Sequence, residues 1–110
     1  PNLYGDIISD LCAGLVGGLG FAPSANIGEN VTIYEAVHGS APDIAGQDKA
    51  NPTALLLSYA MLLKDHGMID QAKKLEQAVY SVVEEGIYTT CDIGGTAGTK
   101  VFTQAVKEKL

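Results

Sequence analysis

The sequence contains no arginine: all seven of its basic residues are lysines, and the formal net charge is −6. Binding to nucleic acid needs a basic face that neutralises phosphates, so this composition argues against that function. Enzymes that bind polycarboxylates or phosphates usually hold them with guanidinium groups. If the chain takes part in such an enzyme, the arginines must come from outside these 110 residues.

Cysteine and long apolar runs are also scarce. Cys12 and Cys91 are not in CxxC spacing, so no disulfide framework is expected and a reduced compartment is favoured. Cys12 is expected to be a small core residue. No run of about eighteen apolar residues and no signal peptide is present, so no membrane interaction is predicted. Because the chain begins at Pro1 without an initiating methionine or a helix cap, we expect a segment of a longer protein.

An apolar fraction of 46% is ample for a packed core, and the spacing of apolar residues predicts several helices with one or two short strands. The expected helices cover residues 4–15, 52–66, 69–85 and the stretch after 99, and the expected strand covers 31–37. Residues 21–28 are predicted to be a loop and residues 88–93 to be extended.

The ends of these helices carry recognisable signals. Asn51 is expected to cap the second helix, and Gly67 to end it in the left-handed conformation. His66 is interpreted as a partner of that helix's negative end and not as a catalytic base. Thr96 or Thr99 is expected to cap the last helix.

The second helix is apolar on almost every side between residues 53 and 63, which predicts burial in the core or between subunits. The strand at 31–37 does not alternate strictly, because Tyr34 and Glu35 interrupt the pattern, so both of its faces are expected to be covered. The third helix has an inward stripe that consists of Ala72, Leu75, Val79, Val82 and Val83.

The run from His38 to Pro52 is rich in glycine and proline and poor in bulky side chains, which predicts an ordered surface loop. Gly39 would let a ligand approach the backbone, and Pro42 fixes the position of the following carboxylate, Asp43. A carboxylate suits the two hydroxyls of a ribose, whereas a 2′-phosphate needs a cation, and none lies between His38 and Gln47. The alternative is a surface loop in which proline and glycine only shape a turn.

Asp6 and Asp10 lie four residues apart, so both carboxylates project from the same face of the first predicted helix. Two like charges at this spacing repel each other by a few tenths of a kcal/mol, roughly, on an isolated helix. A hard divalent cation such as Mg²⁺ or Mn²⁺ would reverse the sign of that effect. The alternative is an ordinary solvated helix face.

The glycines between residues 14 and 20 do not complete a dinucleotide fingerprint. Gly18 and Gly20 have the first spacing of G-x-G-x-x-G, but Pro23 stands at its last position, and no strand precedes them. The glycines are more consistent with a helix end that packs closely on a neighbour. The turn at 94–99 is not a P-loop, because its spacing to Lys100 is wrong.

Three runs together resemble the isocitrate and 3-isopropylmalate dehydrogenase family: residues 2–20, 38–52 and 92–95, in the order that the family has them. The resemblance implies an α/β fold, the large domain of that family and not a Rossmann fold. Residues 1–110 would be the C-terminal portion of this single domain.

The resemblance also implies an activity: oxidation of a 2-hydroxy acid by NAD⁺, followed by metal-assisted loss of CO₂. Asp6 and Asp10 match the positions that bind Mg²⁺ or Mn²⁺, and no catalytic residue is expected within this segment. The expected cofactor-binding residues are His38, Gly39, Ser40, Ala41, Asp43, Ile44, Asn51 and Asp92.

Residues 25–28 and 46–52 most resemble the NAD-dependent, isocitrate-oxidising members. This implies isocitrate as the substrate and a homo- or hetero-oligomer whose active site is shared between subunits. It also implies the mitochondrial matrix if the source is eukaryotic, and otherwise the cytoplasm. The alternatives are a 3-isopropylmalate or homoisocitrate dehydrogenase, or a non-catalytic regulatory subunit, because the residues that select the substrate are expected upstream of Pro1.

Overall fold

The computed structural model describes residues 2–110; Pro1, on which the expectation of a longer parent chain partly rests, lies outside them. The chain is a mixture of helix and strand, as the sequence predicted. Its main elements are α1 (Leu3–Leu15), β1 (Pro23–Ile27), β2 (Thr32–Ala36), α2 (Thr53–Asp65), α3 (Ile69–Glu85) and α4 (Thr99–Glu108). Short 3-10 turns η1 (Leu19–Phe21), η2 (Pro42–Ile44) and η3 (Cys91–Ile93) lie between them.

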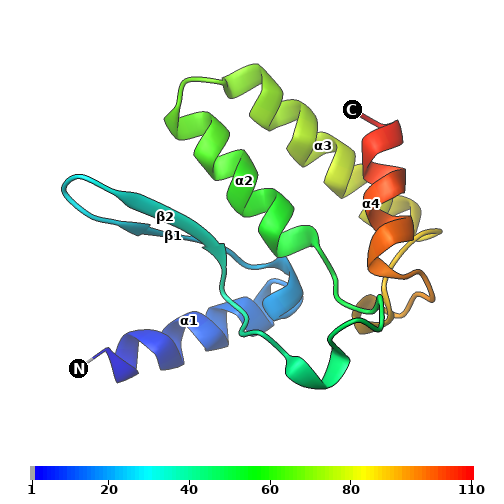
Figure 1. The fold of residues 1–110 in the computed structure, drawn as a ribbon, viewed down its shortest axis with the longest axis horizontal. Helices are drawn as coiled ribbons and strands as arrows, with labels where there is room; N and C mark the ends of the chain where they lie inside the picture. Colours follow the sequence, from blue (N-terminus) through cyan, green and yellow to red (C-terminus); the bar gives the residue numbers. More distant parts are fainter. Residues whose placement is uncertain (1) are drawn as a thin grey trace.

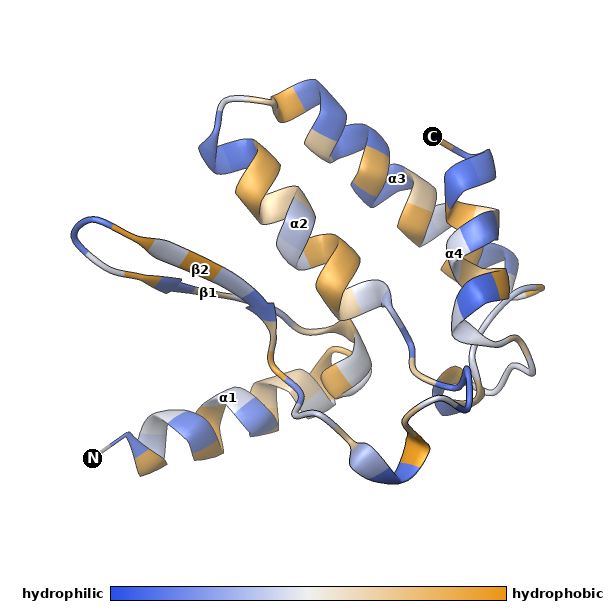
Figure 2. Ribbon diagram, in the orientation of Figure 1, coloured by the Kyte–Doolittle hydropathy of each residue, from blue (hydrophilic) through white to orange (hydrophobic). Residues whose placement is uncertain are grey.

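The core is shared by α2, α3 and α4. Helices α2 and α3 lie side by side, joined by a short turn, and α4 packs against the C-terminal end of α3 (Figure 1). Apolar residues recur along all three helices (Figure 2), and residues from each of them form one buried cluster. The predicted inward stripe of α3 is confirmed, with Val83 partly buried at its edge. The largest fully buried side chain is Phe102 of α4.

The turn between α2 and α3 ends α2 as predicted. Gly67 has a φ of 76°, and the N–H of Met68 donates to the carbonyl of Leu63 at 2.8 Å. Nδ1 of His66 lies 3.0 Å from the carbonyl oxygen of Leu62, which also accepts a hydrogen bond from the backbone N–H of His66 at 3.1 Å, so the ring is held at the helix end. His66 is therefore a partner of the helix end, as its sequence position indicated.

The prediction of a loop at residues 21–28 was wrong. Residues Pro23–Ile27 form β1, which pairs antiparallel with β2 in the register Ala25 to Tyr34. Its sequence has little intrinsic strand preference, and the pairing with β2 supplies the strand conformation. The exposure of β2 alternates along the strand, with Ile33 exposed, so the expectation that both faces are covered was also wrong within the described residues.

Polar contacts fasten the hairpin to α2. Ser58 is buried, and its hydroxyl donates to the carbonyl of Glu35 at 2.7 Å, while the N–H of Ser24 donates to the same hydroxyl oxygen at 3.3 Å. From the next position along β2, the Tyr34 hydroxyl donates to the carboxylate of Asp65, the last residue of α2. This hydrogen bond raises the pKa of Tyr34, because the acceptor is negatively charged and favours the protonated phenol.

Helix α1 extends away from the three-helix core (Figure 1). Its expected apolar face, which includes Ile7 and Leu11, is exposed in residues 2–110, and only Ala13 of the helix is buried. Cys12 is exposed too, so the expectation that it lies in the core was wrong for this chain. None of the described helices has the length and apolar character needed to span a membrane.

The segment before α4 differs from the sequence expectation. Residues Cys91–Ile93 form the turn η3 instead of continuing an extended strand. Neither Thr96 nor Thr99 caps α4 with its side chain, and Gly98 occupies the cap position. The N–H of Lys100 in the first turn of α4 donates instead to the carboxylate of Asp48, which is far away in sequence. For α2 the prediction was close: the helix begins at Thr53, and Oδ1 of Asn51 accepts a hydrogen bond from the Thr53 N–H at 3.0 Å.

Phe102 gives a direct test of the shared core. Substitution Phe102→Ala should lower the free energy of unfolding by about 3–5 kcal/mol, because it removes a fully buried ring and leaves a cavity. Val101→Ala is the matched control: the neighbouring side chain is 47% exposed, and its loss should cost well under about 1 kcal/mol. Urea unfolding of the two variants measures the difference. Equal losses would contradict the placement of α4 against α3.

Candidate functional site

The predicted cofactor loop from His38 to Pro52 lies on the surface as far as Ala50: every residue from His38 to Ala50 is exposed, whereas Asn51 is buried and Pro52 is half-buried. At its centre Pro42, Asp43 and Ile44 form η2, with the N–H of Ile44 donating to the carbonyl of Ala41 at 3.1 Å. The loop therefore has an ordered backbone although it buries almost no side chain.

The backbone of this loop is strained at two positions. Ala41 has a φ of 44° and Asp48 a φ of 56°, and no other residue except glycine has a positive φ within residues 2–110. Residues with a Cβ rarely adopt this conformation, and when they do they tend to lie at functional sites. Both positions fall inside the run that the sequence singled out as a binding loop.

Asp43 presents its carboxylate to solvent at the first turn of η2. Within the described residues this carboxylate takes part in no hydrogen bond or ion pair; only the carbonyl oxygen of Asp43 is used, accepting from Nε2 of Gln47 at 2.7 Å. A fixed backbone with an unused, exposed carboxylate is suitable for a ligand that offers hydroxyl donors.

Two other predicted cofactor residues meet beside the loop. Nδ2 of Asn51 donates to Oδ2 of Asp92 at 2.9 Å, which joins the start of α2 to η3. A Cβ on Gly20 would lie 3.0 Å from Oδ2 of Asp92 and 3.2 Å from Cβ of Asn51, so the absence of a side chain at Gly20 allows this close packing. This close packing is found at Gly20 of η1, whereas Gly14 of α1 and Gly18 have no atom within 4 Å of an added Cβ, so the expectation of a closely packed helix end was wrong for α1.

The remaining predicted residues of the loop are held only by local contacts. Nδ1 of His38 lies 3.0 Å from the carbonyl oxygen of Gly39, and Gly39 has no neighbouring atom within 4 Å of an added Cβ. Ser40 and Ala41 are exposed next to them. The open space at Gly39 leaves room for a ligand to approach the backbone.

Asp6 and Asp10 lie in α1, one turn apart and both exposed, and neither carboxylate has a partner in the part of the chain that the structure describes. Figure 1 shows α1 running away from the cofactor loop towards its N-terminus, so the structure does not bring the Asp pair and the loop together within this chain. Carboxylate oxygens are suitable ligands for Mg²⁺ or Mn²⁺, but two residues are too few. Among residues 2–110 no cluster of three or more metal-binding side chains is present.

Sequence reasoning missed Asp48 and Gly98. The carbonyl oxygen of Asp48 accepts from the N–H of Thr99 at 3.1 Å, and its Oδ1 accepts from the N–H of Lys100 at 3.0 Å. A Cβ on Gly98 would lie 2.6 Å from the carbonyl oxygen of Asp48, so only glycine fits there. No local sequence signal marks this contact, because its two sides are about fifty positions apart.

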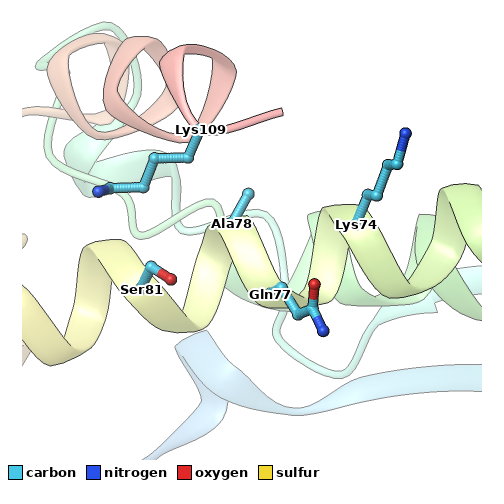
Figure 3. Close-up of a pocket in the computed structure, with 5 residues that line it drawn as sticks. All are labelled: Lys74, Gln77, Ala78, Ser81 and Lys109. Carbon is cyan, nitrogen blue, oxygen red and sulfur yellow. The ribbon is translucent and has the colours of Figure 1, made fainter.

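A surface groove of about 330 Å³ lies elsewhere, between α3 and the C-terminal end of α4. It is lined by Lys74, Gln77, Ala78, Ser81 and Lys109 (Figure 3). The ammonium groups of Lys74 and Lys109 point in different directions, and Lys109 pairs with Glu85 at 2.6 Å. The groove does not contain any predicted site residue and has no converging charges.

Comparison with known proteins extends these observations. The sequence profile described as isocitrate/isopropylmalate dehydrogenase matches residues 1–110. The chain is 59% identical, over its whole length, to the mitochondrial isocitrate dehydrogenase [NAD] catalytic subunit 5 of Arabidopsis thaliana. It is 58% identical to the mitochondrial isocitrate dehydrogenase [NAD] subunit alpha of Sus scrofa. In both cases the chain spans 30% of the length of the relative.

Solved structures agree with the sequence relatives. The crystal structure of isocitrate dehydrogenase from Methylococcus capsulatus superposes with a TM-score of 0.92 at 48% identity, over 97% of this chain and 32% of that one. A protein from Thermus thermophilus superposes with a TM-score of 0.94 at 50% identity, over 98% of this chain and 22% of that one. The three sequence runs, the fold and these matches agree: the chain belongs to the isocitrate/isopropylmalate dehydrogenase family.

Proposed function

We propose that this chain is the C-terminal part of an NAD-dependent isocitrate dehydrogenase, which oxidises isocitrate to 2-oxoglutarate with loss of CO₂. The observation that carries the proposal is the 57–59% identity, across the whole chain, to proteins named as NAD-dependent isocitrate dehydrogenase subunits. The exposed loop with the carboxylate of Asp43 supports it independently.

In this proposal the loop binds NAD⁺. The carboxylate of Asp43 accepts hydrogen bonds from the ribose hydroxyls, and the open backbone at Gly39 lets the adenosine approach. His38, Ser40, Ala41 and Ile44 are exposed in the same loop, and the hydrogen-bonded pair of Asn51 and Asp92 contributes further cofactor contacts in this proposal. A 2′-phosphate at this position would meet the negative charge of Asp43, which favours NAD⁺ over NADP⁺.

Asp6 and Asp10 form part of the metal site in the same proposal. When bound, Mg²⁺ or Mn²⁺ would supply Lewis-acid polarisation of the substrate oxygen during oxidation and decarboxylation. The chain's own contribution is two exposed carboxylates that a rigid helix holds in a fixed relation. The further ligands, the groups that bind the substrate carboxylates and the acid–base groups come from other parts of the parent protein or from a partner subunit.

We also propose that the parent protein is an oligomer. The relatives are named as subunits, and in this chain large apolar side chains remain uncovered on several elements, α1 and α2 among them. On α1 Ile7 and Leu11 are 55% and 66% exposed, and on α2 Leu55 and Tyr59 are 59% and 53% exposed. The apolar stretch expected to lie in the core or between subunits thus keeps a face available.

The mitochondrial names of the relatives favour the mitochondrial matrix if the source is eukaryotic.

Turnover of the full-length parent protein tests the proposed reaction. With Mn²⁺ and NAD⁺, isocitrate should be oxidised and 3-isopropylmalate should not, measured as NADH formation for each substrate separately. The same assay with any sister subunit present distinguishes a catalytic from a regulatory subunit. Turnover of 3-isopropylmalate alone would refute the proposed substrate and place the protein with the other branch of the family.

The role of Asp43 is tested by Asp43→Lys. This change should raise the KM for NAD⁺ by about tenfold, because the ribose hydroxyls lose an anionic acceptor, and should lower the KM for NADP⁺. Glu84→Lys makes the same charge change on the exposed side of α3 and should leave the ratio of the two KM values unchanged. An unaltered ratio in Asp43→Lys would refute the ribose assignment.

The metal assignment is tested by Asp10→Asn. Loss of one anionic ligand should weaken Mn²⁺ binding to the full-length protein by roughly tenfold or more, as measured by calorimetric titration without substrate turnover. Asp70→Asn removes a comparable exposed carboxylate from the first turn of α3 and serves as the control. Equal Mn²⁺ affinity in the two variants would show that Asp10 is part of a solvated face.

A further inference from the structure

The cofactor loop has few ways to keep its shape. All residues from 38 to 50 are exposed, so apolar burial contributes little to its order. Inside the loop, hydrogen bonds link neighbours such as Ala45 and Pro42. Among the described residues, every hydrogen bond that ties positions 38–50 to another element runs to the start of α4.

These hydrogen bonds form one anchor. Asp48 accepts from two successive backbone N–H groups of α4, through its carbonyl oxygen at 3.1 Å and its Oδ1 at 3.0 Å. The hydroxyl of Thr99 donates to the carbonyl of Ala50. The N–H groups at a helix start lack partners within the helix, and the helix dipole there favours a negative charge, so the carboxylate of Asp48 is well placed.

The anchor leads directly to the carboxylate assigned to the ribose. Gln47 precedes Asp48, and its side-chain amide donates to the carbonyl of Asp43 at 2.7 Å, while its own N–H donates to the carbonyl of Ile44 at 3.1 Å. A displacement of Asp48 therefore moves Gln47 and, through it, the turn that presents Asp43. The φ of 56° at Asp48 is tolerated because an aspartate can hold this conformation with side-chain hydrogen bonds.

We propose that Asp48 is a positioning residue for the cofactor: by capping α4 it holds residues 43–50 in the shape that presents Asp43 to the ribose. The inference rests on the proposed NAD⁺ function of the loop for its effect on the enzyme, but the anchor itself depends only on the contacts described. Gly98 is the second part of the device, because any side chain there would push Asp48 away from the helix.

The test compares Asp48→Gly with Asp48→Asn in the full-length protein. Glycine keeps the positive φ and loses the acceptor for the Lys100 N–H, whereas asparagine keeps both a carbonyl oxygen and tolerance for this backbone. Asp48→Gly should speed amide hydrogen exchange at Lys100 by roughly tenfold and raise the KM for NAD⁺ by roughly fivefold, with kcat changed less than about twofold. Asp48→Asn should keep both the exchange rate at Lys100 and the KM for NAD⁺ close to their wild-type values.

Lys49→Gly is the matched control, since it adds the same flexibility to the loop next to an intact cap. If amide exchange at Lys100 is as fast in Lys49→Gly as in Asp48→Gly, the proposal is overturned, because loop flexibility alone would then explain the effect. Unchanged exchange in Asp48→Gly would overturn it as well. Thr99→Val, which removes the other side-chain link, should act in the same direction as Asp48→Gly.

The two proposals fail in different ways. If Asp48→Gly speeds exchange but leaves the KM for NAD⁺ unchanged in an active enzyme, the anchor exists and the positioning role is refuted. If the wild-type protein shows no NAD⁺-dependent turnover, the proposed function fails. In that case the exchange data alone decide whether Asp48 holds the loop.

Discussion

The apolar contact among α2, α3 and α4 is the constraint on which the rest of this chain depends. Phe102 and Val79 are fully buried there, and the cluster around them includes residues from all three helices. Neither the hairpin nor the cofactor loop has a core of its own. The hairpin is fastened to α2 through Ser58, and the loop is fastened to α4 through Asp48, so both take their positions from the packed helices.

Local sequence signals were sufficient wherever the structure is determined by neighbours along the chain. The stripe of α3, the glycine that ends α2 and the exposed, ordered loop after His38 follow from spacing, backbone preference and composition. The family resemblance, carried by three short runs, predicted the fold class correctly. Apart from the fold class, which was inferred from three separate runs, these features share a physical origin: each depends on residues within a few positions of one another.

Contacts between separate elements account for what the sequence did not reveal. Strand β1 contains proline, serine and asparagine, and its conformation comes from pairing with β2. The acceptor that caps α4 comes from Asp48 instead of a nearby threonine. Cys12 was expected in a core, yet α1 meets only a small part of this chain and is mostly exposed. The acceptor at the start of α4 is distant in sequence, the partner of β1 is the next strand along the chain, and Cys12 is exposed because few residues of this chain contact α1.

The contact between Asp48 and the start of α4 also has a consequence for the order of folding. Its two sides are 52 positions apart, so forming it early would require closing a long and flexible stretch of chain. Packing of α2 on α3 involves near neighbours and can come first, and docking of α4 then brings its free N–H groups to the loop. We therefore expect the loop at residues 38–50 to form late, reaching its folded shape only after α4 has been synthesised and has docked.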